Sequence, residues 1–434
     1  MITLVEALRF RCLRYVRQPL GRFHVLVGPN ASGKTTFLDV PALLGRLVSD
    51  GLDAAIRERT QNLEDLFWRR DGTSFELAIE ARIPEEKRTH LQNKSMDTLR
   101  YEVAIGLDPG TQEFIILSEK VLLKVGTAPA ARQSGIFPAE NALPTTILTA
   151  KHTKKTRVVI NKTENGIGGF HEETSNGWVR AFKVGTRRSA LANLPEDEAK
   201  FPISAWFKNF LSEGIRQLSL NGSLLRKASP PGLHRGFVPD GSNLPWVVAD
   251  LQDLGPEFAG ALHQPRRLRS DRVKKDFLED WVSHLRTALP DLESVRTVER
   301  PDDKHRYVVL RYAGGLDVPS WMASDGTLRL MALTLPAYLP GLTGVYLIEE
   351  PENGVHPRAV ETMFQSLSSV YNAQILLATH SPVILSLVDP ADLLCFAKTA
   401  EGATDIVSGK EHPALRDWRG EVNLSDLFAG GVLG

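Results

Sequence analysis

Residues 28–35 read Gly-Pro-Asn-Ala-Ser-Gly-Lys-Thr and fit the pattern G-x-x-x-x-G-K-[ST] at every required position. A short apolar run over residues 23–27 precedes this octapeptide and predicts a buried strand. Apolar residues at helical spacing follow it as far as residue 48 and predict a helix. In such a strand–turn–helix unit, free backbone N–H groups and the positive end of the helix dipole point at one place. The stretch therefore predicts a cradle for the phosphates of a nucleoside triphosphate.

The residue types of the octapeptide predict how the cradle would hold its ligand. Lys34 would reach the β- and γ-phosphates, and the hydroxyl of Thr35 would bind Mg²⁺. A chance glycine-rich turn is the competing interpretation, and the flanking strand and helix argue against it. The residues expected to bind nucleotide here are Gly28, Asn30, Ser32, Gly33, Lys34, Thr35 and Thr36.

The composition is that of an ordinary globular protein. The chain has 434 residues, which exceeds the roughly 250–300 residues at which one hydrophobic core stops growing. Its formal net charge is zero, so no overall field draws it to nucleic acid or to a membrane surface. Cys12 and Cys395 lack C-x-x-C spacing and predict reduced thiols. Because there is no signal-peptide pattern and no long uncharged apolar run, a cytoplasmic protein is expected.

Two acids follow a second buried run in the last third of the chain. Residues 345–348 are continuously apolar, as in a central parallel strand, and Glu349 and Glu350 come directly after them. Ligands bind at this carboxyl edge in open α/β sheets. One carboxylate there can support Mg²⁺, and the second can orient or deprotonate an attacking water. An acidic pair at a strand end without any function is the alternative interpretation.

Two further segments could complete such a site. The buried run of residues 375–379 ends at His380, which would lie at the same sheet edge as the acids and could donate a hydrogen bond to a γ-phosphate. Ser324 opens a second helical pattern, where free N–H groups around Gly326 would form another anion site. Taken singly, the first is an ordinary histidine and the second an ordinary helix cap.

Four motifs in fixed order carry a family resemblance. They are GPNASGKT at 28–35, SDGTLRLMAL at 324–333, LIEEPENGVHP at 347–357 and LATHSP at 377–382. With them the sequence resembles the ABC-type ATPases of the SMC and recombination-protein branch. It is more similar to free-standing AAA ATPases related to OLD-family proteins, such as the ATPase subunits of bacterial anti-phage systems, than to transporters. The resemblance covers roughly residues 1–80 and 300–434, and the segment 237–245 resembles that branch less specifically.

The resemblance implies a role for each matching residue. Lys34 and Thr35 would bind phosphates and Mg²⁺, while Glu349 would take the metal-supporting position. Glu350 would be the general base, and His380 would contact the γ-phosphate. The remaining motif positions would act across a dimer: Ser324 and Gly326 as the signature on the ATP of a second subunit, and residues 353–356 as the D-loop at the seam.

The sequence departs from the family pattern at three places. Glu349 stands where the pattern has Asp, and the signature has Asp-Gly in place of Gly-Gly, with Ala323 where Leu is usual. No residue can be chosen as the Q-loop glutamine, because Gln61 is merely in the vicinity. Coupling between the metal and the inserted residues is therefore left open.

The expected fold is α/β, a P-loop NTPase of the ABC-ATPase head type with a mixed sheet. Residues 1–73 and 300–434 would form the core. Residues 74–184 would form an antiparallel β-rich subdomain, since apolar and polar side chains alternate in segments of residues 74–125. Residues 185–299 predict a mainly helical, globular insertion, including one helix over residues 204–220.

One basic run stands out in this insertion. It has a single opposing acid, Asp271, and would neutralise DNA phosphates without sequence preference. A solvated helix face explains the same composition. The run comprises Arg266, Arg267, Arg269, Arg272, Lys274 and Lys275.

The expected function is Mg²⁺-dependent ATP binding and hydrolysis that drives an ATP-sandwich homodimer, or a higher oligomer. By resemblance, the protein would be the sensor or motor ATPase of a DNA-linked process, in anti-phage defence or DNA repair. The sequence after His380 is too short for an OLD-type nuclease domain, so a separate nuclease or toxin is the expected effector. A nucleotide-gated scaffold with negligible turnover and a transport ATPase are the alternatives.

Overall fold

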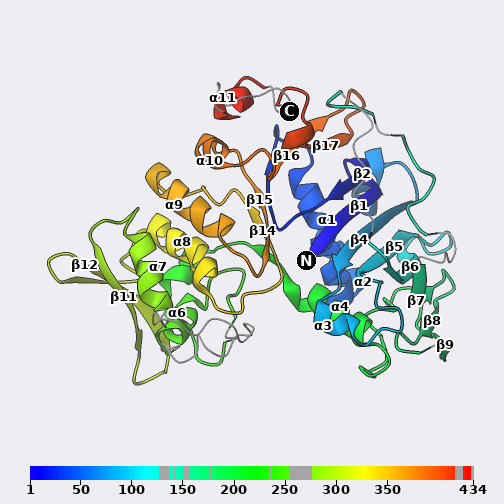
Figure 1. The fold of residues 1–434 in the computed structure, drawn as a ribbon, viewed down its shortest axis with the longest axis horizontal. Helices are drawn as coiled ribbons and strands as arrows, with labels where there is room; N and C mark the ends of the chain where they lie inside the picture. The colour runs from blue at the N-terminus through cyan, green and yellow to red at the C-terminus, as the bar shows by residue number, and fades with distance from the viewer. Residues whose placement is uncertain are drawn as a thin grey trace. The chain divides into compact units, whose positions relative to one another are not determined.

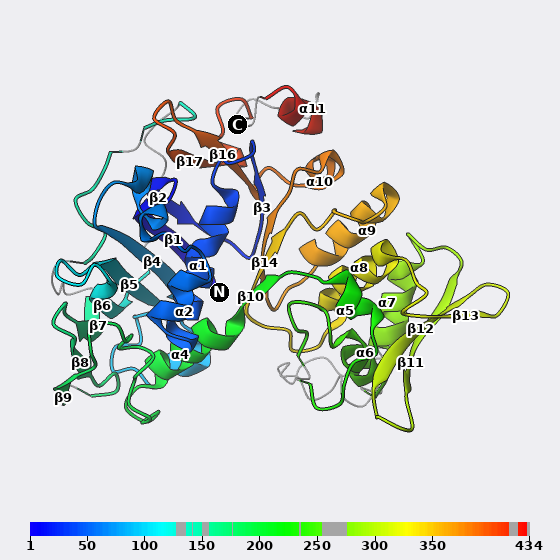
Figure 2. The ribbon, with the colours of Figure 1, turned by 180° about the vertical axis from the view of Figure 1, so that it is seen from behind.

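The structure is a computed structural model in which residues 1–126, 136–140, 142–149, 156–175, 177–233, 236–253, 276–415 and 424–431 are described. The chain divides into two compact units (Figures 1 and 2). Unit 1 comprises Met1–Arg216 and Val388–Gly434, and unit 2 comprises Gln217–Leu387. Among the described residues, no helix combines the length and apolarity needed to cross a membrane.

Unit 1 is built around an eight-stranded sheet in which neighbouring strands are antiparallel. Its strand order is β2-β1-β4-β5-β6-β7-β8-β9. The alternating pattern over residues 74–125 is confirmed as strands. The bounds are β1 Ile2–Phe10, β2 Leu13–Pro19, β4 Ser74–Arg82, β5 Thr98–Leu107, β6 Phe114–Lys124, β7 Thr156–Lys162, β8 Ile167–His171 and β9 Trp178–Lys183.

The two faces of this sheet differ because side chains alternate along each strand. One face is apolar and buried, and the ring of Tyr101 on β5 contacts Phe207 on α4 (Pro202–Gly214). Helix α4 in turn packs against α1 (Lys34–Ser49). The hydrophobic core of unit 1 therefore lies between the sheet and the helix that follows the phosphate cradle.

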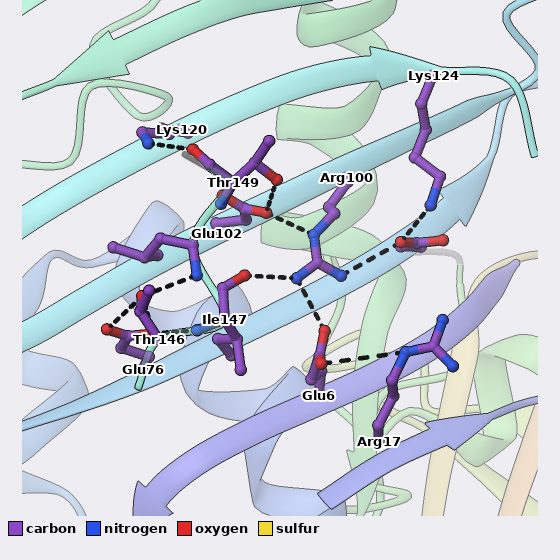
Figure 3. Close-up of polar contacts among 12 residues, drawn as sticks. Glu6, Arg17, Glu76, Arg100, Glu102, Lys120, Lys124, Thr146, Ile147 and Thr149 are labelled. Carbon is purple, nitrogen blue, oxygen red and sulfur yellow. Dashed lines mark hydrogen bonds and ion pairs between the residues drawn. The ribbon is translucent and has the colours of Figure 1, made fainter. Parts of the chain in front are cut away.

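The opposite face carries a buried network of charged side chains (Figure 3). Arg100 forms ion pairs with Glu6 at 2.8 Å, Glu102 at 2.5 Å and Glu80 at 3.2 Å. The segment 146–149 crosses this face, and its main chain joins the network through Ile147 O, which accepts from Arg100 at 3.0 Å. Because each of these carboxylates has the guanidinium of Arg100 as an oppositely charged partner, the three carboxylates and the guanidinium can be buried together.

Three more strands of unit 1 support the phosphate cradle. Strand β3 (Phe23–Val27) is parallel to β16 (Leu393–Lys398), and β16 is antiparallel to β17 (Thr404–Ser408). Residues of β3 are buried along its whole length, as the apolar run predicts. The remaining elements are α2 Leu52–Arg57, η1 Leu63–Leu66, η2 Trp68–Arg70, α3 Glu85–Arg88, η5 Gly409–Glu411 and α11 Leu424–Ala429.

Unit 2 contains the parallel strands β14 (Val345–Glu349) and β15 (Gln374–Ala378). Three helices and a 3₁₀ turn accompany them, and α8 and α9 lie side by side in both views (Figures 1 and 2). Their bounds are α8 Asp325–Thr334, η4 Leu335–Tyr338, α9 Pro357–Ser368 and α10 Pro382–Leu387.

A three-stranded antiparallel sheet completes unit 2, with α6 and α7 packed on it. The largest fully buried side chain, Trp281 on α7, donates its indole N–H to Thr334 Oγ1 at 2.9 Å and so ties this part to α8. The bounds are α5 Gly222–Arg226, α6 Leu244–Asp253, α7 Phe277–Leu285, β11 Leu292–Glu299, β12 Arg306–Tyr312 and β13 Leu316–Pro319.

The helix predicted over residues 204–220 is wrong at its C-terminal end. Helix α4 ends at Gly214, and Ile215–Leu218 form strand β10, which neighbours β14 in the sheet order. A glycine ends the helix, and the β-branched Ile215 then opens a strand whose backbone is satisfied by sheet pairing. The division into a core with two insertions stays a prediction.

Candidate nucleotide site

The octapeptide forms the predicted turn between β3 and α1. Three of its residues have positive φ: Gly28 at 149°, Ala31 at 60° and Gly33 at 104°. Gly33 is the N-cap of α1, and Phe37 N donates to its carbonyl at 2.8 Å. Thr35 is exposed and Thr36 half-buried in the first helical turn, whose free N–H groups can bind an anion. The strand, turn and helix read from the sequence are therefore confirmed as local structure.

Neighbouring strands explain why two positions of the turn must be glycine. A Cβ on Gly28 would lie 2.2 Å from Phe396 O, and a Cβ on Gly33 would lie 2.2 Å from Thr404 Oγ1. Thr404 donates its hydroxyl to Ser32 O at 2.9 Å and its backbone N–H to Cys12 O at 3.0 Å. Thr404 thus holds the turn in place through these hydrogen bonds, a role that no sequence motif indicated.

Lys34 already points back over the turn. Its Nζ donates to Gly28 O at 2.8 Å and to Pro29 O at 2.9 Å, and only 7% of the residue is exposed. The ammonium group is therefore held above the cradle, where phosphate oxygens would be stronger acceptors than carbonyls. All the phosphate-binding residues predicted from the octapeptide belong to unit 1.

The predicted acidic pair belongs to unit 2, beginning with Glu349 at the end of β14. The side chain of Gln217 on β10 donates to Glu349 Oε1 at 3.2 Å. The sequence alone did not indicate that Gln217 would contact Glu349, because a helix was expected through residue 220 where the structure has the strand β10. The usable signal was the glycine at 214 followed by a β-branched residue.

Glu350 has an unusual backbone conformation, with φ at 47°. Its N–H donates to Ala378 O at 2.8 Å, and its carbonyl accepts from Asn353 N at 3.0 Å. The amide of Asn353 also donates to Glu350 Oε2 at 2.6 Å. Left-handed backbone at a non-glycine residue costs energy and is found at functional sites. The exposed carboxylate of Glu350 is thus held in one direction by its own loop.

His380 lies at the same edge of the strand pair as the acids. The parallel register pairs Glu349 with Ala378, so the residues after β14 and β15 emerge together. The backbone N–H of His380 donates to Glu352 Oε1 at 3.1 Å, and the residue is half-buried. The structure therefore brings Glu349, Glu350 and His380 to one edge of unit 2.

The predicted signature begins helix α8 in the same unit. Ser324 is its exposed N-cap, and its Oγ accepts from Thr327 N at 3.1 Å. A Cβ on Gly326 would lie 2.6 Å from Gly354 O, so this glycine allows the helix to touch the loop at 353–356. The helix start and the loop after the acids are therefore packed together.

The residues present fit a nucleoside triphosphate with Mg²⁺. The part of the chain that the structure describes contains no cluster of three His, Cys, Asp or Glu side chains that could hold a metal alone. Mg²⁺ suits such a site, because it binds through one or two protein oxygens together with phosphates and water. Thr35 in unit 1 and Glu349 in unit 2 each carry an oxygen of the kind that binds Mg²⁺. The basic run from Arg266 to Lys275 lies outside the described residues.

Comparisons with known proteins concern the family and the fold. Residues 206–386 match the family model described as "AAA domain, putative AbiEii toxin, Type IV TA system". No curated protein sequence matches the chain. Among solved structures, an Smc head bound to the C-terminal winged-helix domain of ScpA has a TM-score of 0.50 at 13% identity, over 94% of this chain and 97% of that one.

Two further Smc heads align at lower similarity. One, from Pyrococcus furiosus and bound to the C-terminal domain of ScpA, has a TM-score of 0.48 at 14% identity, over 94% of this chain and 95% of that chain. The other, from Thermotoga maritima, has a TM-score of 0.40 at 12% identity, with coverages of 94% and 98%. The first structure confirms the expected fold class: the chain has the α/β fold of an SMC ATPase head, and residues 206–386 match an AAA-domain model.

Proposed function

We propose that this protein binds and hydrolyses ATP with Mg²⁺ and that ATP joins two copies of it head to head. The observation that carries the proposal is the backbone of Glu350. This residue is held in a left-handed conformation beside Glu349 and His380, with its carboxylate fixed by Asn353. Such strain is retained where a side chain must point in one direction.

The residues of each unit would supply a different part of the chemistry. Lys34 and the N–H groups of the turn would hold the β- and γ-phosphates, and Thr35 would bind the metal. Glu349 would support Mg²⁺, and Glu350 would take the proton of the attacking water. His380 would stabilise negative charge on the γ-phosphate. When bound, Mg²⁺ would neutralise charge on the phosphate oxygens.

The signature supports the dimer proposal. Ser324 is exposed at the start of α8, and the first-turn N–H groups there form an anion site on the surface of unit 2. A second copy of the chain would offer its ATP phosphates to this helix end. ATP would then stabilise the dimer, and hydrolysis would release it.

The proposed biological role is that of a sensor or motor ATPase in a DNA-linked process, either anti-phage defence or DNA repair. The family model's description, which refers to a toxin and a toxin–antitoxin system, supports a partnership with a separate toxin or nuclease. The Smc head with the matching fold binds a protein partner, ScpA. DNA is proposed to bind the basic run 266–275.

The proposal is tested with Glu350→Gln, which keeps the shape and the Asn353 contact but removes the base. The affinity for ATP should stay within about threefold of the wild-type value, and turnover should fall by about 10²- to 10⁴-fold. Light scattering should show that the variant accumulates as a dimer when ATP is present. Glu361→Gln, an exposed substitution on α9, is the matched control and should leave both unchanged. Equal turnover in wild type and Glu350→Gln would instead favour the nucleotide-gated scaffold.

A further inference from the structure

Glu352 is a half-buried acid within the motif at 347–357 that has no part in the catalytic roles above. Its Oε1 accepts from the hydroxyl of Thr379 at 2.6 Å and from His380 N at 3.1 Å. Within the described chain, Oε2 is buried and has no hydrogen-bond partner. A carboxylate costs free energy when one oxygen is buried without a donor, so a purely structural tie would not favour this side chain.

The contacts of Glu352 join the two segments that carry the proposed catalytic groups. Glu352 belongs to the loop after β14, two residues beyond Glu350, and its partners belong to the turn after β15. A second bond connects the same segments, because Glu350 N donates to Ala378 O at 2.8 Å. Thr379 Oγ1 then accepts from Ser381 N at 2.9 Å, which extends the connection beyond His380.

We infer that Glu352 is a positioning residue that sets the backbone of His380 relative to Glu350. The inference rests on the proposed ATPase function. If the bond from Glu350 N to Ala378 O were alone, the turn after β15 could rotate about it. The carboxylate of Glu352 adds two more bonds, one to Thr379 and one to His380, beyond that point. Two points of attachment fix both the distance and the orientation of the turn. A displacement of about 1 Å at a reacting centre can lower a rate about 10²-fold.

The strained backbone of Glu350 supports the same conclusion. A left-handed residue persists only when its surroundings determine its conformation more than once. Glu350 has bonds from Asn353 on one side and to Ala378 on the other. Glu352 lies between Glu350 and Asn353 in the chain and bonds the loop to the fully buried Thr379.

The test compares Glu352→Ala with Glu352→Gln in the full-length protein, using ATP and Mg²⁺. Glu352→Ala should lower kcat by about 10- to 100-fold while the Kd for ATP changes less than about threefold. Its His380 amide should also exchange faster with deuterium in the protein without nucleotide. Glu352→Gln retains an acceptor for both donors and should restore most of the turnover and the slow exchange.

Thr379→Val provides a second variant that leaves Glu352 in place, with Thr379→Ser as its conservative match. Because both changes break the same contact, the double variant Glu352→Ala/Thr379→Val should be no slower than Glu352→Ala alone. Additive losses, or a loss of ATP affinity and melting temperature in parallel with kcat, would overturn the positioning role.

The result stays interpretable if the wild type binds ATP but has no turnover. That outcome refutes the proposed hydrolysis, and the positioning role is then decided by exchange alone. ATP with Mg²⁺ should slow exchange in the peptide 376–384 of the wild type and not in Glu352→Ala. Equal protection in both proteins would overturn the inference.

Discussion

The side-chain amide of Gln217 donates a hydrogen bond to Glu349 Oε1 at 3.2 Å. This contact joins β10, the first strand after α4, to the strand that ends in the acidic pair. Gln217 is exposed and therefore available to a ligand as well as to Glu349. The pair links the metal-supporting position of the proposed site to the segment that enters unit 2.

Removing the side-chain amide of Gln217 should weaken the binding of the Mg²⁺ that the proposed hydrolysis uses, so that more Mg²⁺ would be needed. Gln217→Ala is expected to raise the Mg²⁺ concentration needed for half-maximal turnover about threefold to tenfold, because Glu349 loses the donor that orients it. Affinity for ATP without metal should not change. A Mg²⁺ titration of turnover measures the effect, and Gln252→Ala, an exposed substitution on α6, should behave as wild type. An unchanged Mg²⁺ dependence would remove Gln217 from the site.

Loss of the cradle lysine should weaken nucleotide binding. Lys34 is held over the turn by Gly28 O and Pro29 O, and Lys34→Ala removes the only charge placed there by the octapeptide. The affinity for a fluorescent ATP analogue is expected to fall by at least about tenfold, since a charge-assisted bond to phosphate contributes roughly 1.5–3 kcal/mol. The exposed Lys94→Ala should retain wild-type affinity.

The glycine at the start of α1 gives a test of packing. Gly33→Ala places a Cβ 2.2 Å from Thr404 Oγ1 and 3.1 Å from Cys12 Sγ at a φ of 104°. Gly51→Ala has a similarly positive φ of 88° but meets nothing within 4 Å. Both should lose stability through backbone strain. Only Gly33→Ala should also lose ATP binding, because its turn must move away from Thr404.

The charged face of the eight-stranded sheet should be sensitive to its one central cation. Arg100→Met leaves Glu6, Glu80 and Glu102 buried without that partner, a change expected to cost about 3–5 kcal/mol in urea unfolding. Deuterium exchange of residues 146–149 should accelerate, since Ile147 O loses its donor (Figure 3).

The control for this change is Arg17→Met at the exposed rim of the same network, 4.0 Å from Glu6. An exposed ion pair contributes about 1 kcal/mol or less, so this variant should unfold close to wild type. Equal losses of unfolding free energy in Arg100→Met and Arg17→Met would show that burial does not determine how much these ion pairs contribute.

Stability should depend on pH through Glu173, which accepts from Ser204 N and Ile203 N at the start of α4. Burial raises the pKa of Glu173 from 4.5 to about 7, against the lowering effect of those bonds. The folded protein thus keeps a proton that the unfolded chain releases. The stability from this proton is complete below pH 4.5 and is lost as the pH rises to about 7.

Glu173→Gln stays uncharged, and this substitution should remove that slope. The free energy of unfolding of the wild type relative to the variant should fall with rising pH in this window, by at most about 1.4 kcal/mol per pH unit. Glu164→Gln in the exposed β7–β8 turn should keep the wild-type slope. A flat difference between wild type and Glu173→Gln would contradict the raised pKa.

Much of the local structure could be read from residue order. The turn at 28–35 needs glycines at 28 and 33, where φ is positive, and the apolar runs before Glu349 and His380 predicted the buried strands that the structure has. These features depend on neighbours within a few residues. The end of α4 could not be read, because sheet pairing of β10 overrode a helical apolar pattern.

The sequence by itself determined the phosphate turn, the acid-ended strand, the helix cap at Ser324 and the order in which they occur, because each is written in adjacent residues. Only the tertiary structure decided which distant side chains complete them. Three such contacts join residues that do not share a motif: Thr404 with the turn, Gln217 with Glu349, and Glu352 with His380. Their contacts arise from strand register and from the burial of polar groups, which require a partner wherever the fold places one.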